Sequence, residues 1–286
     1  MPLYYGILTV SVIMFGIQFF FSDKYQRDAG NGAYASFLFS FAGSVAAIIV
    51  LAVIAGFDFS LTPFAAIWSL VVATNNILFT IFSLKALERV NLSVFSLFSM
   101  LGGMLLPFFL GLIFYGEPMT LGKGVSVVLI TAALAMTVTR TDNKGGGIYY
   151  LAVFVLNGMC GVLAKIYEDS ALPKVSDAGF SLWVAIASAL ISGIALLALR
   201  KQWKKPTLGG LILGAGGGAL EKVANFLLLI ALAVLPASVQ YPFITGGVMI
   251  TSAAFAYLTP SKPGRRELAS IGVAFLGLLA LVLIPI

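Results

Sequence analysis

The residues best suited to chemistry lie inside a long apolar stretch, residues 207–234. Glu221, Lys222 and Asn225 come about fourteen residues after its start. At about 1.5 Å of rise per helical residue, this is near the middle of a hydrocarbon layer about 30 Å thick. A full charge at that depth costs about 3 kcal/mol, so it marks either a functional site or a compensating pair.

Two interpretations of this cluster are open. In the first, Glu221 binds an amine or a proton, and Lys222 neutralises a carboxylate or a phosphate; an acid beside a base suits a zwitterion such as an amino acid. In the second, the two charges form a structural pair that joins two helices. Adjacent helical residues point about 100° apart, so Glu221 and Lys222 need not bond each other.

The composition predicts that these residues are held in a membrane. Of the 286 residues, 60% are hydrophobic and only 10% are charged, with a mean hydropathy of +1.05. A soluble domain carries about 25% charged residues. The apolar runs are continuous and do not alternate as barrel strands do, so we expect an all-α, multi-pass protein of the cell (plasma or inner) membrane.

Several kinds of chemistry are excluded by the residues that the chain lacks. There is no His and a single Cys, Cys160, so the chain holds no internal disulfide and no metal site built from Cys and His. We therefore predict that the protein is not an enzyme and needs no cofactor. The formal charge of +6 is typical of basic cytoplasmic loops in a membrane protein, and we expect no nucleic-acid partner.

The apolar runs and the breaker residues between them predict ten transmembrane helices. Glu117 is expected in one of the short connections, at the start of the next helix, with Thr120 as the helix cap. The Gly-rich part of the eighth run, residues 209–218, is expected to be a packing face. The predicted spans are 3–21, 32–56, 62–84, 91–115, 120–139, 147–167, 178–199, 207–234, 237–258 and 267–285.

The two halves of the chain resemble each other. Residues 16–26 align with 158–168, a shift of 142 (158−16), and residues 86–102 align with 231–247, a shift of 145 (231−86). Five spans per half is an odd number, so the second half must enter the membrane in the opposite orientation. We therefore predict two inverted five-helix repeats, residues 1–141 and 146–286, with a substrate site near mid-membrane where they meet.

The shift of 145 pairs polar residues in the third and eighth spans. It sets Asn76 opposite Glu221 and Thr80 opposite Asn225. Each pair is spaced i, i+4 and so lies on one helix face. Taken singly, each of these residues and Asn75 could equally hydrogen-bond a neighbouring helix. As a symmetric set, they favour a shared binding site.

Four further residues are candidate ligands for the substrate. Trp68 lies seven residues before Asn75, on the same helix face, and can stack on a planar ligand. Ser99 closes a stripe of serines, while Gln240 and Tyr241 precede Pro242, whose missing N–H weakens the helix locally. For each of them, helix packing is the competing interpretation.

Sequence motifs also resemble a known family. The matching segments are residues 85–87, 94–107, 114–118, 121–138, 231–239 and 246–247. In these segments the chain resembles the EamA-type drug/metabolite transporter superfamily. The resemblance covers essentially the whole chain. It implies a ten-helix fold that moves amino acids, nucleotide sugars, sugar phosphates, drugs or other metabolites. Lys165 resembles the lysine that commonly closes the first helix of a half.

These observations together predict a secondary-active transporter that moves a small polar, amino-acid-like metabolite by alternating access. Proton coupling through Glu221, or exchange, would drive it. A flippase for lipids or lipid-linked sugars on the same fold is the alternative, and the protein would act as a monomer or a homodimer. Lys and Arg number thirteen on one set of alternate loops and three on the other, which predicts both termini outside, although members of the resembled superfamily often have both inside.

Overall fold

The computed structural model describes residues 2–29, 32–87, 92–137, 147–200, 207–256 and 264–284. In these ranges the chain forms ten α-helices and no strand, which confirms the all-helical prediction. The helices are α1 (Pro2–Ala29), α2 (Ala33–Ile54), α3 (Pro63–Leu87), α4 (Leu92–Phe114), α5 (Leu121–Thr137), α6 (Gly147–Asp169), α7 (Asp177–Ala198), α8 (Leu208–Leu232), α9 (Ala237–Ala256) and α10 (Arg265–Leu283).

Local chemistry sets where the helices begin and where connections turn. Thr207 caps α8 by accepting the N–H of Gly210 at 2.9 Å, and the Thr120 hydroxyl accepts the N–H of Lys123 at 3.3 Å, as expected for a cap. The connection after α4 turns at Gly116, whose φ of 62° is strained for any residue with a side chain.

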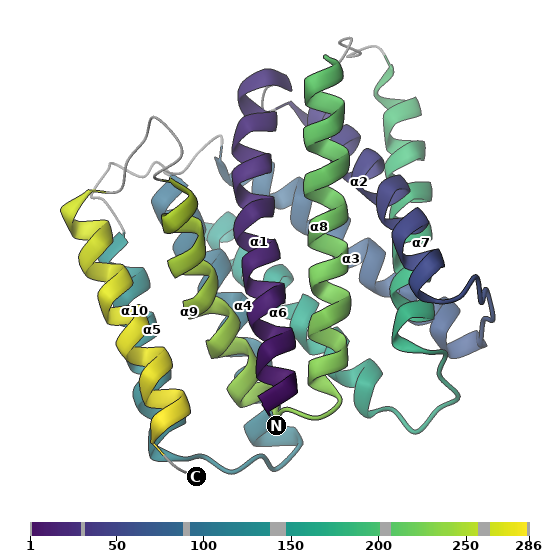
Figure 1. Ribbon diagram of the computed structural model, residues 1–286. Helices are drawn as coiled ribbons and strands as arrows, with labels where there is room; N and C mark the ends of the chain where they lie inside the picture. Colours follow the sequence, from purple (N-terminus) through teal and green to yellow (C-terminus); the bar gives the residue numbers. More distant parts are fainter. Residues whose placement is uncertain are drawn as a thin grey trace.

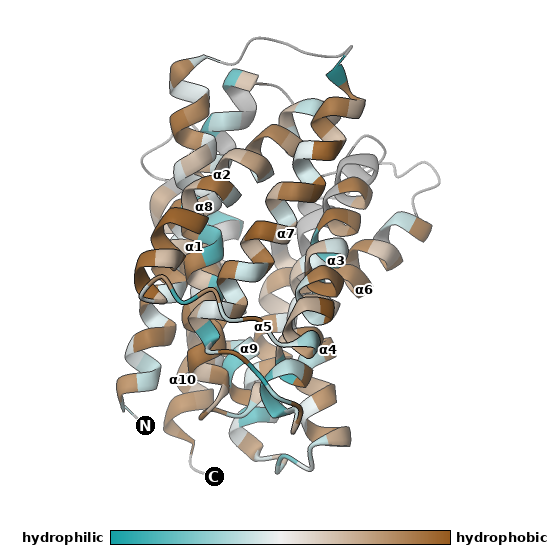
Figure 2. Cartoon of the chain, turned by 90° about the vertical axis from the view of Figure 1, so that its right-hand side faces the viewer, coloured by the Kyte–Doolittle hydropathy of each residue, from teal (hydrophilic) through white to brown (hydrophobic). Residues whose placement is uncertain are grey.

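Part of the chain is long and apolar enough to cross a membrane. Judged by length and composition of the described residues, five helices qualify, and four others contain shorter apolar segments of 10–17 residues. Figure 2 shows hydrophobic residues along most of the helix lengths, with hydrophilic ones mainly near the ends. The five qualifying segments are Pro2–Ser22, Ala33–Ile54, Leu151–Asp169, Asp177–Ala198 and Leu208–Leu232.

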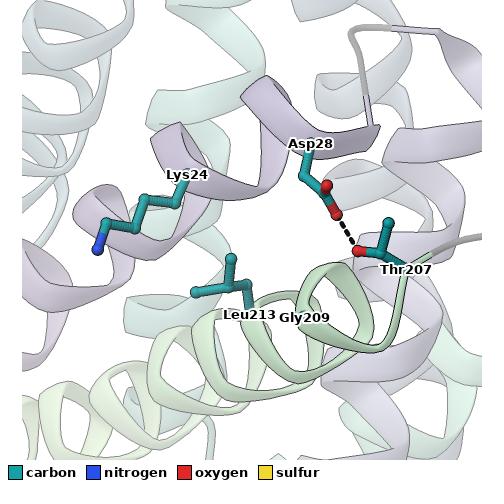
Figure 3. A pocket seen from close by; sticks show the side chains of 5 residues that line it. All are labelled: Lys24, Asp28, Thr207, Gly209 and Leu213. Atoms are coloured by element: carbon teal, nitrogen blue, oxygen red, sulfur yellow. Dashed lines mark hydrogen bonds between the residues drawn. The ribbon is translucent and has the colours of Figure 1, made fainter.

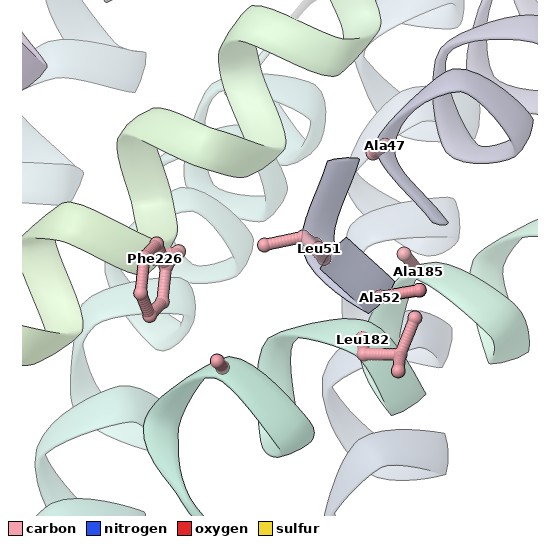
Figure 4. Packing of buried hydrophobic residues seen from close by; sticks show 7 residues of the cluster. Ala47, Leu51, Ala52, Leu182, Ala185 and Phe226 are labelled. Atoms are coloured by element: carbon pink, nitrogen blue, oxygen red, sulfur yellow. The ribbon is translucent and has the colours of Figure 1, made fainter. Parts of the chain in front are cut away.

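The helices pack as a bundle in which sequence-distant elements lie side by side. α1 packs against α8 and α9, while α6 packs against α3 and α4 (Figure 1). α2 contacts α7 and α8, and α5 pairs with α10. One core cluster joins α2, α7 and α8 through Leu51, Leu182 and Phe226 (Figure 4).

The Gly-rich run of α8 is a packing face, as predicted, and α8 continues through it without a break. A Cβ atom placed on Gly218 would lie 2.6 Å from the Cα of Gly43 in α2, and Gly214 lies against Tyr25 of α1. Glycine is required here because the two helix backbones touch.

The bundle has two distinct ends. Both termini lie at one end (Figure 1), which also carries Glu117 and the start of α9; we call it the Glu117 end. The end of α1 and the start of α8 meet at the opposite end, the Thr207 end. α1 continues past the apolar run predicted at 3–21, because the buried Tyr25 ring packs inside and its hydroxyl donates to the carbonyl of Ala35 at 2.6 Å.

Candidate functional site

α6 is the helix on which the predicted site residues converge. Its main-chain carbonyls accept hydrogen bonds from side chains of α3 and α9. These bonds run from Asn75 Nδ2 to Leu156 O at 3.0 Å, from Trp68 Nε1 to Leu163 O at 2.9 Å, and from Tyr241 Oη to Gly161 O at 3.0 Å. Residues of both halves of the chain therefore meet at α6.

Cys160 of α6 connects the two predicted asparagines. Asn75 Nδ2 lies 3.2 Å from its sulfur, and the thiol donates to Asn76 Oδ1 at 3.3 Å. Asn75 is buried, and Asn76 is half-buried on the adjacent side of α3. The sequence gives no signal for this role of Cys160, because a lone cysteine in an apolar run resembles a small core residue.

Glu221 and Asn225 lie one turn apart in α8. Asn225 Nδ2 donates to the main-chain carbonyl of Glu221 at 2.8 Å. Asn225 is exposed, whereas Glu221 and Lys222 are half-buried. The ion pairs found among the described residues involve neither Glu221 nor Lys222, so the described structure shows no charge pair that joins helices at this point.

Asn225 is an exposed residue on a largely buried face of α8. At about 100° per residue, Glu221 and Asn225 share a face with Gly218 on one side and with Leu228 and Leu232 on the other. Gly218 is buried against α2, and the two leucines are buried against α9. Asn225 is therefore exposed between positions that are buried.

Glu221 of α8 is near enough to α6 for an electrostatic interaction. Its charge is close enough to act electrostatically on the Cys160 thiol. The structure thus joins Asn75 and Asn76 through hydrogen bonds to Cys160, and Asn225 to the main chain of Glu221. Thr80 belongs to α3, but its side chain lies outside the described part of the structure.

The remaining predicted ligands are engaged in helix contacts in this conformation. Gln240 is fully buried and donates to the carbonyl of Leu228 at 2.8 Å. Trp68 packs on Phe64, with ring centroids 5.6 Å apart, in addition to its bond to α6. Ser99 contributes its main-chain carbonyl, which accepts from Asn157 Nδ2 at 2.7 Å. A ligand role for these residues stays a prediction.

Glu117 has a role that the sequence did not reveal. Its carboxylate does not serve the following helix but accepts the main-chain N–H groups of Ala237 and Ser238, each at 2.9 Å, and the Ser238 hydroxyl. These are the free N–H groups at the start of α9, where the helix dipole favours a negative charge. The sequence gives no signal for this pairing, because 120 residues separate the partners.

A basic residue completes the cluster around Glu117. Lys165 Nζ lies 3.9 Å from the Glu117 carboxylate and 2.8 Å from that of Asp169. Only 9% of the Glu117 side chain and 10% of the Lys165 side chain are exposed. The cluster joins the α4–α5 connection, α6 and α9 with charges shielded from solvent.

Two hollows open on the outside of the molecule. One, of about 450 Å³, lies at the Thr207 end, between Lys24 and Asp28 of α1 and residues Thr207, Gly209 and Leu213 (Figure 3). The other, of about 460 Å³, is an apolar groove between α3 and α6. The part of the chain that the structure describes holds no group of three or more His, Cys, Asp or Glu residues that could bind a metal ion.

No protein-family model matches the chain, and comparison with the curated proteins finds no match either. A solved structure described as "Crystal structure of protein" is similar over 99% of this chain and 97% of its own length. The TM-score is 0.79 and the sequence identity is 13%. This likeness concerns the fold alone.

Proposed function

We propose that this chain is a secondary-active transporter that moves a small polar metabolite by alternating access, with Glu221 in its binding site. One observation carries the proposal: Glu221 is half-buried in the middle of α8, has no ion-pair partner among the described residues, and adjoins the exposed Asn225. An acid held at this depth without a partner is costly in a membrane, so we infer that it serves a ligand or a proton.

The proposal includes ten membrane spans in two inverted repeats, residues 1–141 and 146–286. The helix contacts support it. α1 packs on α8 and α9, and α6, five helices later, packs on α3 and α4. Three further contacts, α2–α7, α4–α9 and α5–α10, each join a helix of the first half to the helix at the same place in the second half. A two-fold relation between the halves leaves such pairs unchanged.

Close contacts at glycines support the same relation residue by residue. A Cβ on Gly102 would lie 2.0 Å from the Phe154 carbonyl, and one on Gly247 would lie 2.9 Å from Val12. These positions are related by shifts of 145 (247−102) and 142 (154−12), the shifts that align the two halves in sequence. The contacts of Gly158 with Leu106 and of Gly16 with Thr251 are related by the same two shifts.

The remaining features of the proposal follow from the sequence. We assign the chain to the drug/metabolite transporter superfamily and to the plasma or inner membrane. An amino-acid-like substrate would place its ammonium group against Glu221, and amides such as Asn76 and Asn225 would hydrogen-bond it. Protonation of Glu221 offers a way to couple transport to a proton gradient.

The test begins with a thermal-shift screen of amino acids, amines, nucleotide sugars and sugar phosphates on the purified protein. Uptake of the stabilising compound is then measured in proteoliposomes without ATP. Glu221→Gln, which keeps the shape and removes the charge, is expected to lower uptake about tenfold or more. Asp58→Asn removes an exposed carboxylate from the α2–α3 connection and serves as the control that keeps uptake.

Full uptake by the Glu221→Gln variant would contradict the assignment of the site. For proton coupling, an imposed pH gradient is expected to drive uptake by the unmodified protein and not by the variant. Equal stimulation of both proteins would remove protons from the proposal and leave exchange.

A second candidate, a flippase for lipids or lipid-linked sugars, is favoured by the groove between α3 and α6. A flippase needs a lateral opening for acyl chains, and this groove borders the helix seam that Asn75 and Cys160 close. A headgroup-scrambling assay with fluorescent phospholipids in the same proteoliposomes separates the two functions. Scrambling without solute uptake would favour the flippase.

A further inference from the structure

The groove between α3 and α6 has the form of a slot along one helix. On α3 its lining residues follow the pattern i, i+3, i+4, i+7, i+8, i+11, so they form one continuous stripe. Met159 and Leu163 of α6 line it from the other side. The α3 residues are Ile67, Leu70, Val71, Thr74, Asn75 and Leu78.

The dimensions of the slot match one leaflet of a bilayer. From Ile67 to Leu78 the helix rises about 16 Å, at about 1.5 Å per residue. Half of a hydrocarbon core about 30 Å thick is about 15 Å. The slot starts one turn after Pro63, the first residue of α3, and runs from the Glu117 end toward the level of Asn75 and Asn76.

The lining is suited to an aliphatic chain. Ile67 is 62% exposed and Leu70 is 53% exposed, and none of the lining residues is charged. The amide N–H groups of Asn75 are directed to Leu156 and Cys160, across the seam. The lining, with Thr74 and Asn75 as its polar residues, offers few hydrogen-bond partners for the backbone of a peptide, whereas a hydrocarbon chain needs none.

We propose that this groove binds one acyl chain of a phospholipid from the leaflet at the Glu117 end. The proposal rests on the membrane embedding put forward above. A chain in the slot contacts both α3 and α6, so it makes more dispersion contacts than a chain on a flat helix face. It therefore stays bound when the surrounding lipid is removed.

The experiment compares two tryptophans placed at equal depth. Leu70 lies seven residues after the start of α3, inside the groove, and Val128 lies seven residues after the start of α5, where it is 67% exposed. Leu70→Trp and Val128→Trp are reconstituted with phosphatidylcholine brominated in its acyl chains, which quenches both. The variants are then transferred to detergent, and each signal is corrected for the native tryptophans with the parent protein.

After transfer, Leu70→Trp is expected to stay quenched while Val128→Trp recovers its fluorescence. Adding Thr74→Phe, which fills the groove, is expected to release the quenching of Leu70→Trp. Native mass spectrometry of the parent protein is expected to show one retained phospholipid, and the Thr74→Phe variant none. Equal recovery of both tryptophans, quenching that persists with Thr74→Phe, or retention of a free fatty acid would overturn the proposal.

Uptake is measured in the same proteoliposomes. Because lipid retention is read without a transport substrate, failure of the groove proposal and failure of the transport proposal give different results. Uptake that is lost through Glu221→Gln, together with equal tryptophan recovery, would refute only the lipid site. Retained lipid with uptake unaffected by Glu221→Gln would refute only the transport site.

Discussion

The first residues of α9 and the Thr207 cap of α8, at opposite ends of the bundle, each donate hydrogen bonds to a carboxylate from elsewhere in the chain. The two arrangements differ in the number of hydrogen bonds and in burial. At the Glu117 end, Glu117 accepts two main-chain N–H groups and a hydroxyl of α9, with Lys165 beside it, and the side chains are nearly buried. At the Thr207 end, the exposed Asp28 carboxylate accepts one hydrogen bond within the described part of the chain, from the Thr207 hydroxyl, and Thr207 itself caps α8.

The surroundings of the α8 start are also more open than those of the α9 start. An open hollow lies beside Asp28 and Thr207 (Figure 3). Closer to the middle, α8 is held to α2 by the backbone contact between Gly218 and Gly43. Helices at the Glu117 end are thus joined by nearly buried charged side chains. In the other half of the bundle, α2 and α8 are joined by direct backbone contact. If the protein works by alternating access, as we propose, we expect the cluster around Glu117 to break before that end opens.

The largest expected effect comes from removing the buried carboxylate. Glu117→Ala leaves two N–H groups and a hydroxyl without an acceptor and takes one partner from Lys165. We expect it to lower the free energy of unfolding by about 3 kcal/mol. The matched change Asp28→Ala, at an exposed site, is expected to cost about 0.5 kcal/mol. Thermal unfolding in detergent measures both, and equal shifts would contradict the comparison.

A smaller effect is expected from the glycine contact. Gly218→Ala places a methyl group 2.6 Å from the Gly43 Cα, so we expect a loss of about 2 kcal/mol. Gly209→Ala is the control in the same helix, since the nearest atom to its new Cβ would be the Thr207 hydroxyl oxygen at 3.9 Å. It should leave stability unchanged or slightly higher, because alanine favours helix. Equal stability of both variants would show that α2 and α8 separate without cost.

The third prediction concerns access to the site itself. In a Cys160→Ser background, which removes the single native cysteine, Asn225→Cys is labelled with a membrane-impermeant thiol reagent from each side of oriented vesicles. We expect labelling about tenfold faster from the Thr207 end, a factor that corresponds to about 1.4 kcal/mol. Adding Glu117→Gln should reduce this ratio. A ratio of one in the parent variant would mean that the two ends are sealed equally.

Much of the fold could be predicted because apolar runs and breaker residues are local features. The predicted spans and the ten helices agree within a few residues, apart from α1, which continues to Ala29 because Tyr25 finds a buried position beyond the apolar run. The i, i+4 relation of Glu221 and Asn225 was equally local. The pairing of Asn75 and Asn76 with Cys160 was not, since it depends on which helices become neighbours.

The sequence by itself determined that the chain is helical and apolar, where its helices begin and end, and which residues carry charge at the middle of α8. Helix formation and hydrophobicity depend on near neighbours, so they can be read along the chain. Only the tertiary structure decided that Glu117 caps α9, that α6 is the meeting point of the polar side chains, and that Asn225 is exposed while the turns on either side of it are buried. These depend on the docking of helices up to 120 residues apart, and many sequences with the same apolar pattern can dock differently.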